Sequence, residues 1–126
     1  MPTYEIAVES VFSASHAIQL HDGSLEPLHG HNWNVTAAIR APKLDPMGLV
    51  CDFHTLQAAL QEVCSLLNNT HLNENPLILR AGVNPTAEQI AALIAAQLIQ
   101  RLGRACGLDR VSVSEAPGCT AAWLAD

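Results

Sequence analysis

Basic residues are scarce in this chain of 126 residues, and their scarcity argues against nucleic-acid binding. Lysine and arginine together number 6, the net charge is −6, and the basic side chains form no run. Binding to a phosphate backbone depends on clustered positive charge. We therefore expect no DNA or RNA partner.

Long apolar runs and paired cysteines are also missing. No window reaches the roughly 18 apolar residues of a membrane span, and the first residues lack the basic and apolar regions of a signal peptide. The 4 cysteines are widely scattered with no C-x-x-C pair, which argues against a thiolate zinc cluster and a dense disulfide framework. These absences predict a cytoplasmic protein with reduced thiols and no membrane partner.

What the chain does contain is a high share of apolar residues. Hydrophobic residues make up 49% and charged residues only 14% of the sequence. The length suits one domain, residues 1–126, with a single core. So few charged side chains suggest that part of the apolar surface is covered by another copy of the chain.

Three histidines stand where the apolar faces of two predicted strands end. Side chains alternate along a strand, so the segment Tyr4 to His16 places His16 on its apolar face. In the segment His29 to Arg40, both His29 and His31 share the apolar face. Three neutral imidazoles at one point leave a fourth position of tetrahedral zinc free, as in catalytic zinc sites. Imidazole also suits copper, nickel and iron, so zinc is the preferred ion among several.

The remaining pattern predicts two helices followed by two strands. Apolar residues recur at helical spacing from Phe53 to Leu67, and Asn73 to Val83 is expected to be a loop because Pro76 and Gly82 break regular structure. A second helix starts at Thr86, whose spacing to Gln89 is that of a capping box, and continues to Leu102.

Alternation resumes from Arg110 to Glu115, and the segment Cys119 to Leu124 can pair beside it. The order strand, strand, helix, helix, strand, strand favours an α+β fold, an antiparallel sheet with two helices packed on one face. Glu115 ends a row of apolar residues, where a carboxylate needs a partner.

Several short strings occur in an order that resembles the 6-pyruvoyl-tetrahydropterin synthase family, which includes 6-carboxytetrahydropterin synthase. The resemblance covers nearly the whole chain, and the F-x-A-x-H and H-G-H-N elements are its most specific parts. The strings are Phe12-Ser13-Ala14-Ser15-His16, His29-Gly30-His31-Asn32, Asp52-Phe53, Asn84-Pro85-Thr86-Ala87-Glu88 and Ser114-Glu115.

The resemblance implies a tunnelling fold that assembles as a dimer of trimers, with active sites at subunit junctions. It implies zinc held by His16, His29 and His31, and 7,8-dihydroneopterin triphosphate as substrate. Glu115 would anchor the pterin ring and take part in proton transfer, and Thr86 would contact the substrate.

Two departures from the family pattern concern the proton-transfer groups. Most relatives carry a cysteine where this chain has Leu25, whereas Glu26 here gives an E-x-x-H-G-H string. That string resembles a subgroup in which glutamate replaces the cysteine and the product is 6-hydroxymethyl-7,8-dihydropterin, formed by retro-aldol cleavage. The usual Asp-His pair aligns with Asn68 and Asn69, so His71, two residues farther on, becomes the candidate relay.

Three functional interpretations remain open at this stage. The leading one is a zinc lyase of pterin metabolism with Glu26 as the base, which yields the hydroxymethyl product or else a 6-carboxy- or 6-pyruvoyl-tetrahydropterin. The second is a pterin-binding paralogue that has lost turnover. The third is an oligomer with a structural metal.

Overall fold

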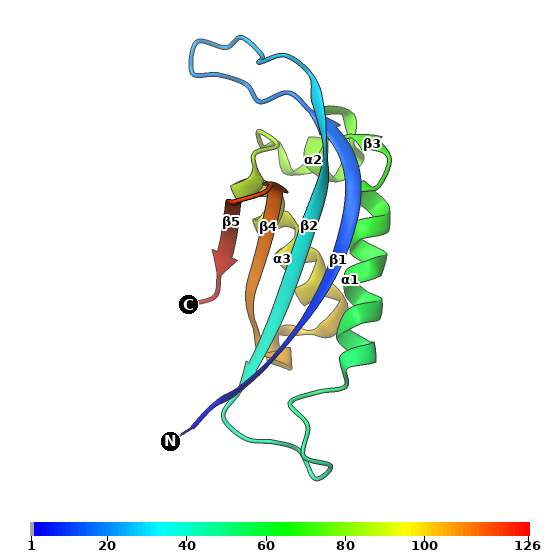
Figure 1. Cartoon of the computed structure of the whole chain (residues 1–126), viewed down its shortest axis with the longest axis vertical. Helices are drawn as coiled ribbons and strands as arrows, with labels where there is room; N and C mark the ends of the chain where they lie inside the picture. Colours follow the sequence, from blue (N-terminus) through cyan, green and yellow to red (C-terminus); the bar gives the residue numbers. More distant parts are fainter. Residues whose placement is uncertain (1) are drawn as a thin grey trace.

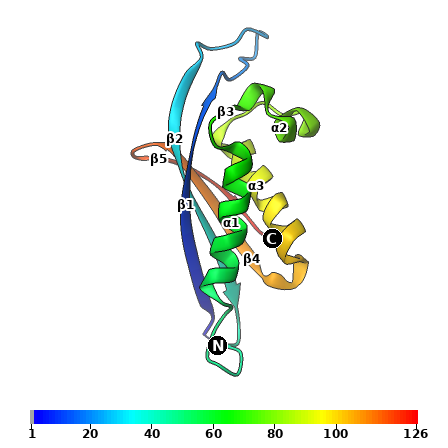
Figure 2. The same ribbon diagram turned by 90° about the vertical axis from the view of Figure 1, so that its right-hand side faces the viewer.

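A five-stranded sheet with all its longer helices on one face forms the molecule, as the computed structural model of residues 2–126 shows (Figure 1 and Figure 2). Two 3₁₀ turns, Leu72–Glu74 and Arg104–Cys106, join neighbouring elements. The elements are β1 Tyr4–His16, β2 His29–Ala41, α1 Phe53–Leu67, β3 Thr70–His71, α2 Pro76–Ala81, α3 Ala87–Leu102, β4 Leu108–Ala116 and β5 Cys119–Leu124.

The sheet order is β3-β1-β2-β4-β5, and every pairing except that of β3 with β1 is antiparallel. The α+β prediction with two helices on one face is therefore confirmed, and β3 makes the sheet mixed. Two residues are too few to show an alternating pattern, so β3 left no signal in the sequence.

The β1–β2 hairpin is the longest ladder and carries the histidines at its open end. Its register runs without a shift from Tyr4 opposite Ala41 to His16 opposite His29. A slip of one residue would turn every side chain to the other face. The connection between the two strands projects beyond the sheet (Figure 1).

The core lies between the sheet and the two long helices. Helix α1 packs on β1, and α3 packs on β4 and β5. At the centre the rings of Phe12 and Trp33 stack with centroids 5.6 Å apart, and Trp33 Nε1 donates to the Ala14 carbonyl at 3.2 Å. Trp33 is fully buried, so this indole anchors the strands just below the histidines.

The prediction of a loop over residues 73–83 is wrong, because the segment contains α2. Asn75 caps the helix by accepting from the Leu77 amide at 2.9 Å, and Pro76 occupies its first turn. Gly82 ends it with φ of 68°. Proline is common in the first turn of a helix and glycine just past its end, so the same two residues fit a short helix as well as a loop.

Among residues 2–126, no helix is both long and apolar enough to span a bilayer.

Burial within α1 predicts which leucine substitutions will lower the free energy of unfolding most. Leu60 is fully buried, whereas Leu66 on the same helix is 42% exposed. Leu60→Ala should lower the free energy of unfolding by about 2–5 kcal/mol because it leaves a cavity. Leu66→Ala should cost much less. Urea unfolding followed by circular dichroism measures both, and equal losses would contradict this packing.

Candidate metal centre

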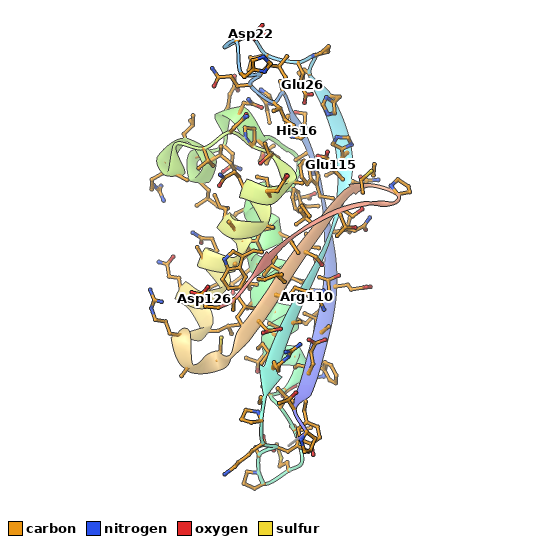
Figure 3. All side chains as sticks on the ribbon, turned by 90° about the vertical axis from the view of Figure 1, so that its left-hand side faces the viewer. His16, Asp22, Glu26, Arg110, Glu115 and Asp126 are labelled. Atoms are coloured by element: carbon orange, nitrogen blue, oxygen red, sulfur yellow. The ribbon has the colours of Figure 1, made fainter. Side chains whose placement is uncertain are left out.

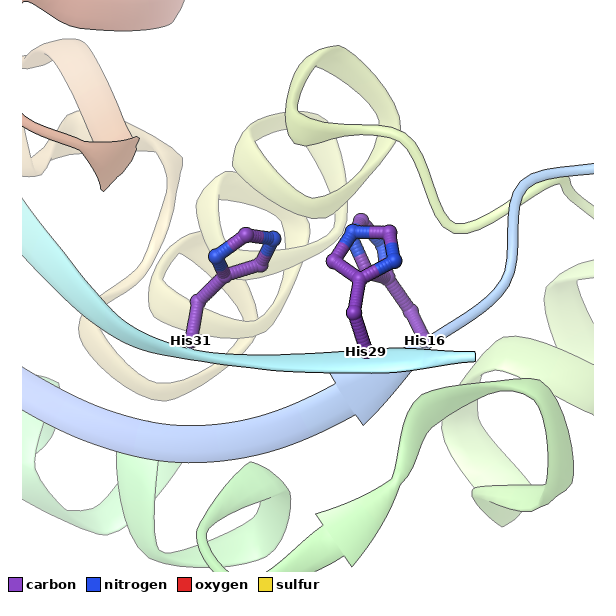
Figure 4. A group of neighbouring side chains, drawn as sticks. All are labelled: His16, His29 and His31. Atoms are coloured by element: carbon purple, nitrogen blue, oxygen red, sulfur yellow. The ribbon is translucent and has the colours of Figure 1, made fainter. Parts of the chain in front are cut away.

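Three histidine rings meet at the open end of the β1–β2 hairpin (Figure 4). His16 ends β1, and His29 and His31 begin β2. Their ring centroids lie 4.7 to 5.2 Å apart, and one nitrogen of each ring falls within 4.8 Å of the others. The strand alternation predicted this convergence, which is the geometry of a metal site.

Two backbone carbonyls determine which nitrogen faces the centre of this group. His16 Nδ1 lies 2.8 Å from the Pro85 carbonyl oxygen, and His29 Nδ1 lies 2.9 Å from that of Pro27. A carbonyl only accepts, so each Nδ1 carries the hydrogen and, in the neutral ring, each Nε2 presents a lone pair. Metal-binding histidines are oriented by the same kind of second contact.

The two Nε2 atoms lie 3.1 Å apart, and this separation tests whether a cation fits. Two lone pairs at that distance repel unless a proton or a cation lies between them. Ligands about 2.0–2.1 Å from a tetrahedral zinc would be about 3.3 Å apart. The observed spacing of His16 and His29 therefore fits a shared ion.

Two further buried atoms beside them have no hydrogen-bond partner among the described residues: His31 Nε2 and Glu115 Oε2. They are 3.9 Å apart, and the same carboxylate oxygen is 3.4 Å from His16 Nε2. Buried polar atoms without partners are costly, and an ion or a ligand is a common reason for their presence. The donor set of three imidazoles with one carboxylate nearby suits zinc.

Burial lowers the pKa of His31 below its ordinary value. The attraction of the Glu115 carboxylate opposes this effect, and the neighbouring His29 and His16 add to it. The net direction favours the neutral ring. Only neutral imidazole binds a metal, so this direction is compatible with His31 as a candidate ligand.

Glu115 reaches the histidines from β4 at an irregularity in the sheet. Ser114 pairs with Thr120 and Ala116 with Cys119, so Glu115 is the extra residue of a β-bulge. Bulges re-aim side chains and are frequent beside active sites. An open cleft of about 640 Å³ adjoins Glu115, and its lining comprises His31, Asn32, Asn34, Ser114, Glu115, Ala116 and Pro117.

Glu26 lies on the opposite side of the histidines, in the connection between β1 and β2. Its Oε1 accepts from the Ile18 amide at 3.1 Å and is 3.7 Å from His29 Nε2. Figure 3 shows His16, Glu26 and Glu115 near the same end of the sheet, with Arg110 farther away. Leu25, by contrast, is 61% exposed.

His71 is not brought to the three histidines of its own chain. It pairs with Ser15 in the sheet, and its Nδ1 lies 3.2 Å from the Ser15 hydroxyl. Because neighbouring residues of a strand point to opposite faces, Ser15 and His71 lie on the face away from His16. The relay role of His71 stays a prediction, and the structure shows His71 beside Ser15 rather than beside His16.

Asn68 and Asn69 attach the end of α1 to β1, at the positions where the family pattern has an Asp-His pair. Asn68 Oδ1 accepts from the Ser13 amide at 2.9 Å, and the Asn69 amide donates to the Ser13 carbonyl at 2.6 Å. Asn69 has φ of 57°, a left-handed conformation that asparagine tolerates better than most residues. Both residues have a structural role here.

Thr86 caps α3 as predicted, with its hydroxyl accepting from the Gln89 amide at 3.1 Å. The second half of the capping box is not formed, because the Thr86 amide donates to the Asn84 carbonyl. The cap directly follows Pro85, whose carbonyl holds His16. Thr86 thus lies next to the candidate metal centre, and its contact with substrate stays a prediction.

Thiol chemistry has no support at this centre. Burial is the main reason why the pKa of Cys51 lies above its ordinary value, and Cys106 and Asp52 raise it further. Burial likewise raises the pKa of Cys64. All four cysteines are free. A raised pKa leaves less of the reactive thiolate, so Cys51 and Cys64 are poor nucleophiles.

Comparison with known proteins now identifies the family. Residues 5–125 match the family model described as 6-pyruvoyl tetrahydropterin synthase. The chain belongs to that family. A putative 6-carboxy-5,6,7,8-tetrahydropterin synthase from Archaeoglobus fulgidus is 33% identical over 110 residues, which cover 87% of this chain and 86% of that protein.

Solved structures show the same fold. The 6-pyruvoyl tetrahydropterin synthase of Caenorhabditis elegans superposes with a TM-score of 0.84 at 20% identity, covering 100% of this chain and 98% of that one. A Plasmodium vivax 6-pyruvoyltetrahydropterin synthase, solved as a variant in which a catalytic glutamate is replaced by alanine, has a TM-score of 0.79 at 23% identity, with 98% of each chain covered.

Sequence reasoning missed the backbone groups that complete this centre. The carbonyls of Pro27 and Pro85 orient two of the rings, and no side-chain pattern encodes a carbonyl contact. A proline two residues before the H-G-H string and another in the N-P-T string were the available signals.

Removing one histidine should abolish tight metal binding. We expect His29→Ala to weaken zinc affinity by more than the roughly 10–100-fold that outer contacts to a zinc ligand contribute. His54→Ala, which changes an exposed histidine of α1, is the matched control and should leave affinity unchanged. Competition with a chromophoric chelator measures both constants. Equal affinities in the two variants would contradict the assignment.

Proposed function

We propose that this chain is a zinc-dependent lyase that acts on 7,8-dihydroneopterin triphosphate and releases 6-hydroxymethyl-7,8-dihydropterin. One observation carries the proposal: a carboxylate, Glu26 Oε1, lies 3.7 Å from His29 Nε2. This placement supports Glu26 as a base that belongs to the same chain as the candidate metal centre. Membership in the pterin synthase family supports the substrate class.

The metal would be held by the Nε2 atoms of His16, His29 and His31. Zinc bound there would polarise the hydroxyl groups of the substrate side chain and lower their pKa. The carbonyls of Pro27 and Pro85 keep two of the rings aimed at the centre.

Glu26 is suited to take the proton from the hydroxyl on the second side-chain carbon. As that oxygen becomes a carbonyl, the bond between the first and second side-chain carbons breaks, and its electron pair moves toward the pterin ring. Return of the proton to the first carbon gives the hydroxymethyl group, and the remainder leaves as a two-carbon aldehyde that carries the triphosphate. A positioned base of this kind contributes about 10²–10⁴-fold.

Glu115 is suited to hold the pterin ring. Its Oε2 is buried without a donor among the described residues, and the ring N–H and exocyclic amine of a pterin are donors. The adjoining cleft of about 640 Å³ is within the usual size of small-ligand sites. We place Thr86 beside the bound substrate as a further contact.

A catalytic glutamate has a precedent in this fold, because the Plasmodium vivax synthase has one. The Archaeoglobus relative favours a second candidate function, the formation of a 6-carboxy-tetrahydropterin. 6-Pyruvoyl-tetrahydropterin remains a third possible product. Asn68 and Asn69 cannot replace the proton-transfer pair of the family. The alternative to catalysis is therefore a paralogue that binds pterin without converting it.

We further propose that the chain acts as a cytoplasmic homo-oligomer, a dimer of trimers with active sites between subunits. His71 supports this arrangement, because it lies on the sheet face away from its own histidine cluster. Any role for it in proton relay is then in the site of a neighbouring copy.

Identifying the product tests the proposed function. Zinc-loaded protein incubated with 7,8-dihydroneopterin triphosphate should yield 6-hydroxymethyl-7,8-dihydropterin, detected by fluorescence chromatography after oxidation. Glu26→Gln should lower kcat by about 10²-fold or more, because it removes the base, and should leave zinc and pterin affinity unchanged. Glu62→Gln, on the exposed side of α1, is the control.

A carboxy- or pyruvoyl-pterin product would replace the retro-aldol assignment with the second or third candidate. Pterin binding without conversion would establish the paralogue. Full activity in Glu26→Gln would remove Glu26 from the mechanism.

A further inference from the structure

The segment that follows His16 leads to an isolated bridge between Gln19 and Leu25, and no strand of the described residues lies beside it on the outer edge. β3 ends at His71, opposite Ser15. Beyond that point two asparagine side chains take the place of a neighbouring strand. Each one both accepts from and donates to the backbone of a single residue.

The first amide is that of Asn73, which bonds to Ala17. Asn73 Oδ1 accepts from the Ala17 amide at 2.8 Å, and its Nδ2 donates to the Ala17 carbonyl at 2.7 Å. The second is that of Asn84, which bonds to Gln19 in the same way at 2.8 and 2.9 Å. Both sets have the lengths of good main-chain ladder bonds.

The residue between these two anchors is the one that holds Glu26. Alternate residues of an extended chain direct their amide and carbonyl to opposite edges, so Ile18 faces inward when Ala17 and Gln19 face outward. Its amide donates to Glu26 Oε1 at 3.1 Å, and its carbonyl accepts from the Glu26 amide at 3.0 Å. The Glu26 carboxylate thus replaces one main-chain partner of an antiparallel pair.

Among the described residues, the tip of the projecting hairpin, residues 20–25, has hydrogen bonds only within the hairpin itself. Leu20 and Gln19 contact Ser24 and Leu25 across it, and hydrogen bonds from Ser24 keep the pKa of Asp22 at the tip below its usual value. In the described part of the chain, the four asparagine bonds are the hydrogen bonds that join residues 17–28 to anything beyond residue 41.

We propose that Asn73 and Asn84 are positioning residues, which clamp Ala17 and Gln19 so that Ile18 holds the Glu26 carboxylate beside His29. The catalytic part of this inference rests on the proposed function, in which Glu26 is the base. The clamp itself is a property of the fold. Asn73 lies in the 3₁₀ turn Leu72–Glu74 that precedes α2, and Asn84 lies in the segment that follows α2.

Asn68 provides a matched control within the same strand edge. Its side chain also accepts from a β1 amide, that of Ser13, at 2.9 Å. Ser13 precedes the histidines, and its hydrogen bonds outside the β1–β2 ladder go to Asn68, Asn69 and Asn32. Asn68→Ala therefore removes a similar bond to the same strand without loosening the clamp.

Hydrogen exchange of the zinc-loaded protein tests the clamp without reference to turnover. In Asn73→Ala and Asn84→Ala the amides of Ile18 and Glu26 should exchange about tenfold faster or more, as expected for the loss of two ordinary hydrogen bonds. The amide of Val35 in β2 should be unaffected, and Asn68→Ala should leave Ile18 protected. Unchanged exchange at Ile18 in both clamp variants would overturn the inference.

Steady-state kinetics then test the link to Glu26. The clamp variants should lose about tenfold in kcat with little change in KM or zinc affinity, and Asn68→Ala should keep the parent kcat. Asn84→Gln, which keeps both the acceptor and the donor of the amide on a side chain one methylene longer, provides a milder change if the alanine variant does not fold, and its loss should be intermediate. A loss confined to KM, or an equal loss in Asn68→Ala, would refute positioning of the base.

The two arms separate the possible failures. Faster exchange at Ile18 in the clamp variants, together with full activity in Glu26→Gln, would refute the proposed function and support the clamp. Loss of activity in Glu26→Gln, with parent exchange rates and kcat in the clamp variants, would support the proposed function and refute the clamp.

Discussion

The pairing of His16 with His29 across the β1–β2 ladder is the constraint on which the site depends. Thirteen consecutive residues of each strand keep this register, and the buried Trp33 and Phe12 hold the strands against the helices directly below it. His31 follows automatically, because it is two residues along the same strand face. The precision of the centre therefore comes from regular β-structure rather than from a loop.

Around that pair the fold aims acceptor atoms, the Nε2 atoms of the rings and Oε2 of Glu115, at the centre of the cluster. The carbonyls of Pro27 and Pro85 occupy the outer nitrogens of two rings, and the bulge in β4 turns the Glu115 carboxylate inward. In an empty site these lone pairs and this charge would repel one another at short range. A bound cation would remove the repulsion, and this supports the interpretation of the cluster as a metal centre.

The parts of the structure that could be predicted from the sequence are those with a local pattern. Strand alternation placed all three histidines on one face, and helical spacing placed α1 and α3. Helix α2 was missed because Pro76 and Gly82 mark helix ends and loops alike. The roles of Asn73 and Asn84 could not be predicted, because their partners lie 56 and 65 residues away and no local pattern encodes such contacts. Glu26 was found only through family resemblance.

The central claim is that His16, His29 and His31 bind a single cation through their Nε2 atoms. Anomalous scattering at the zinc edge from crystals of the zinc-loaded protein tests it most directly. The account predicts one strong peak within about 2.0–2.1 Å of all three Nε2 atoms. A peak elsewhere, or coordination through any of the Nδ1 atoms, would contradict it.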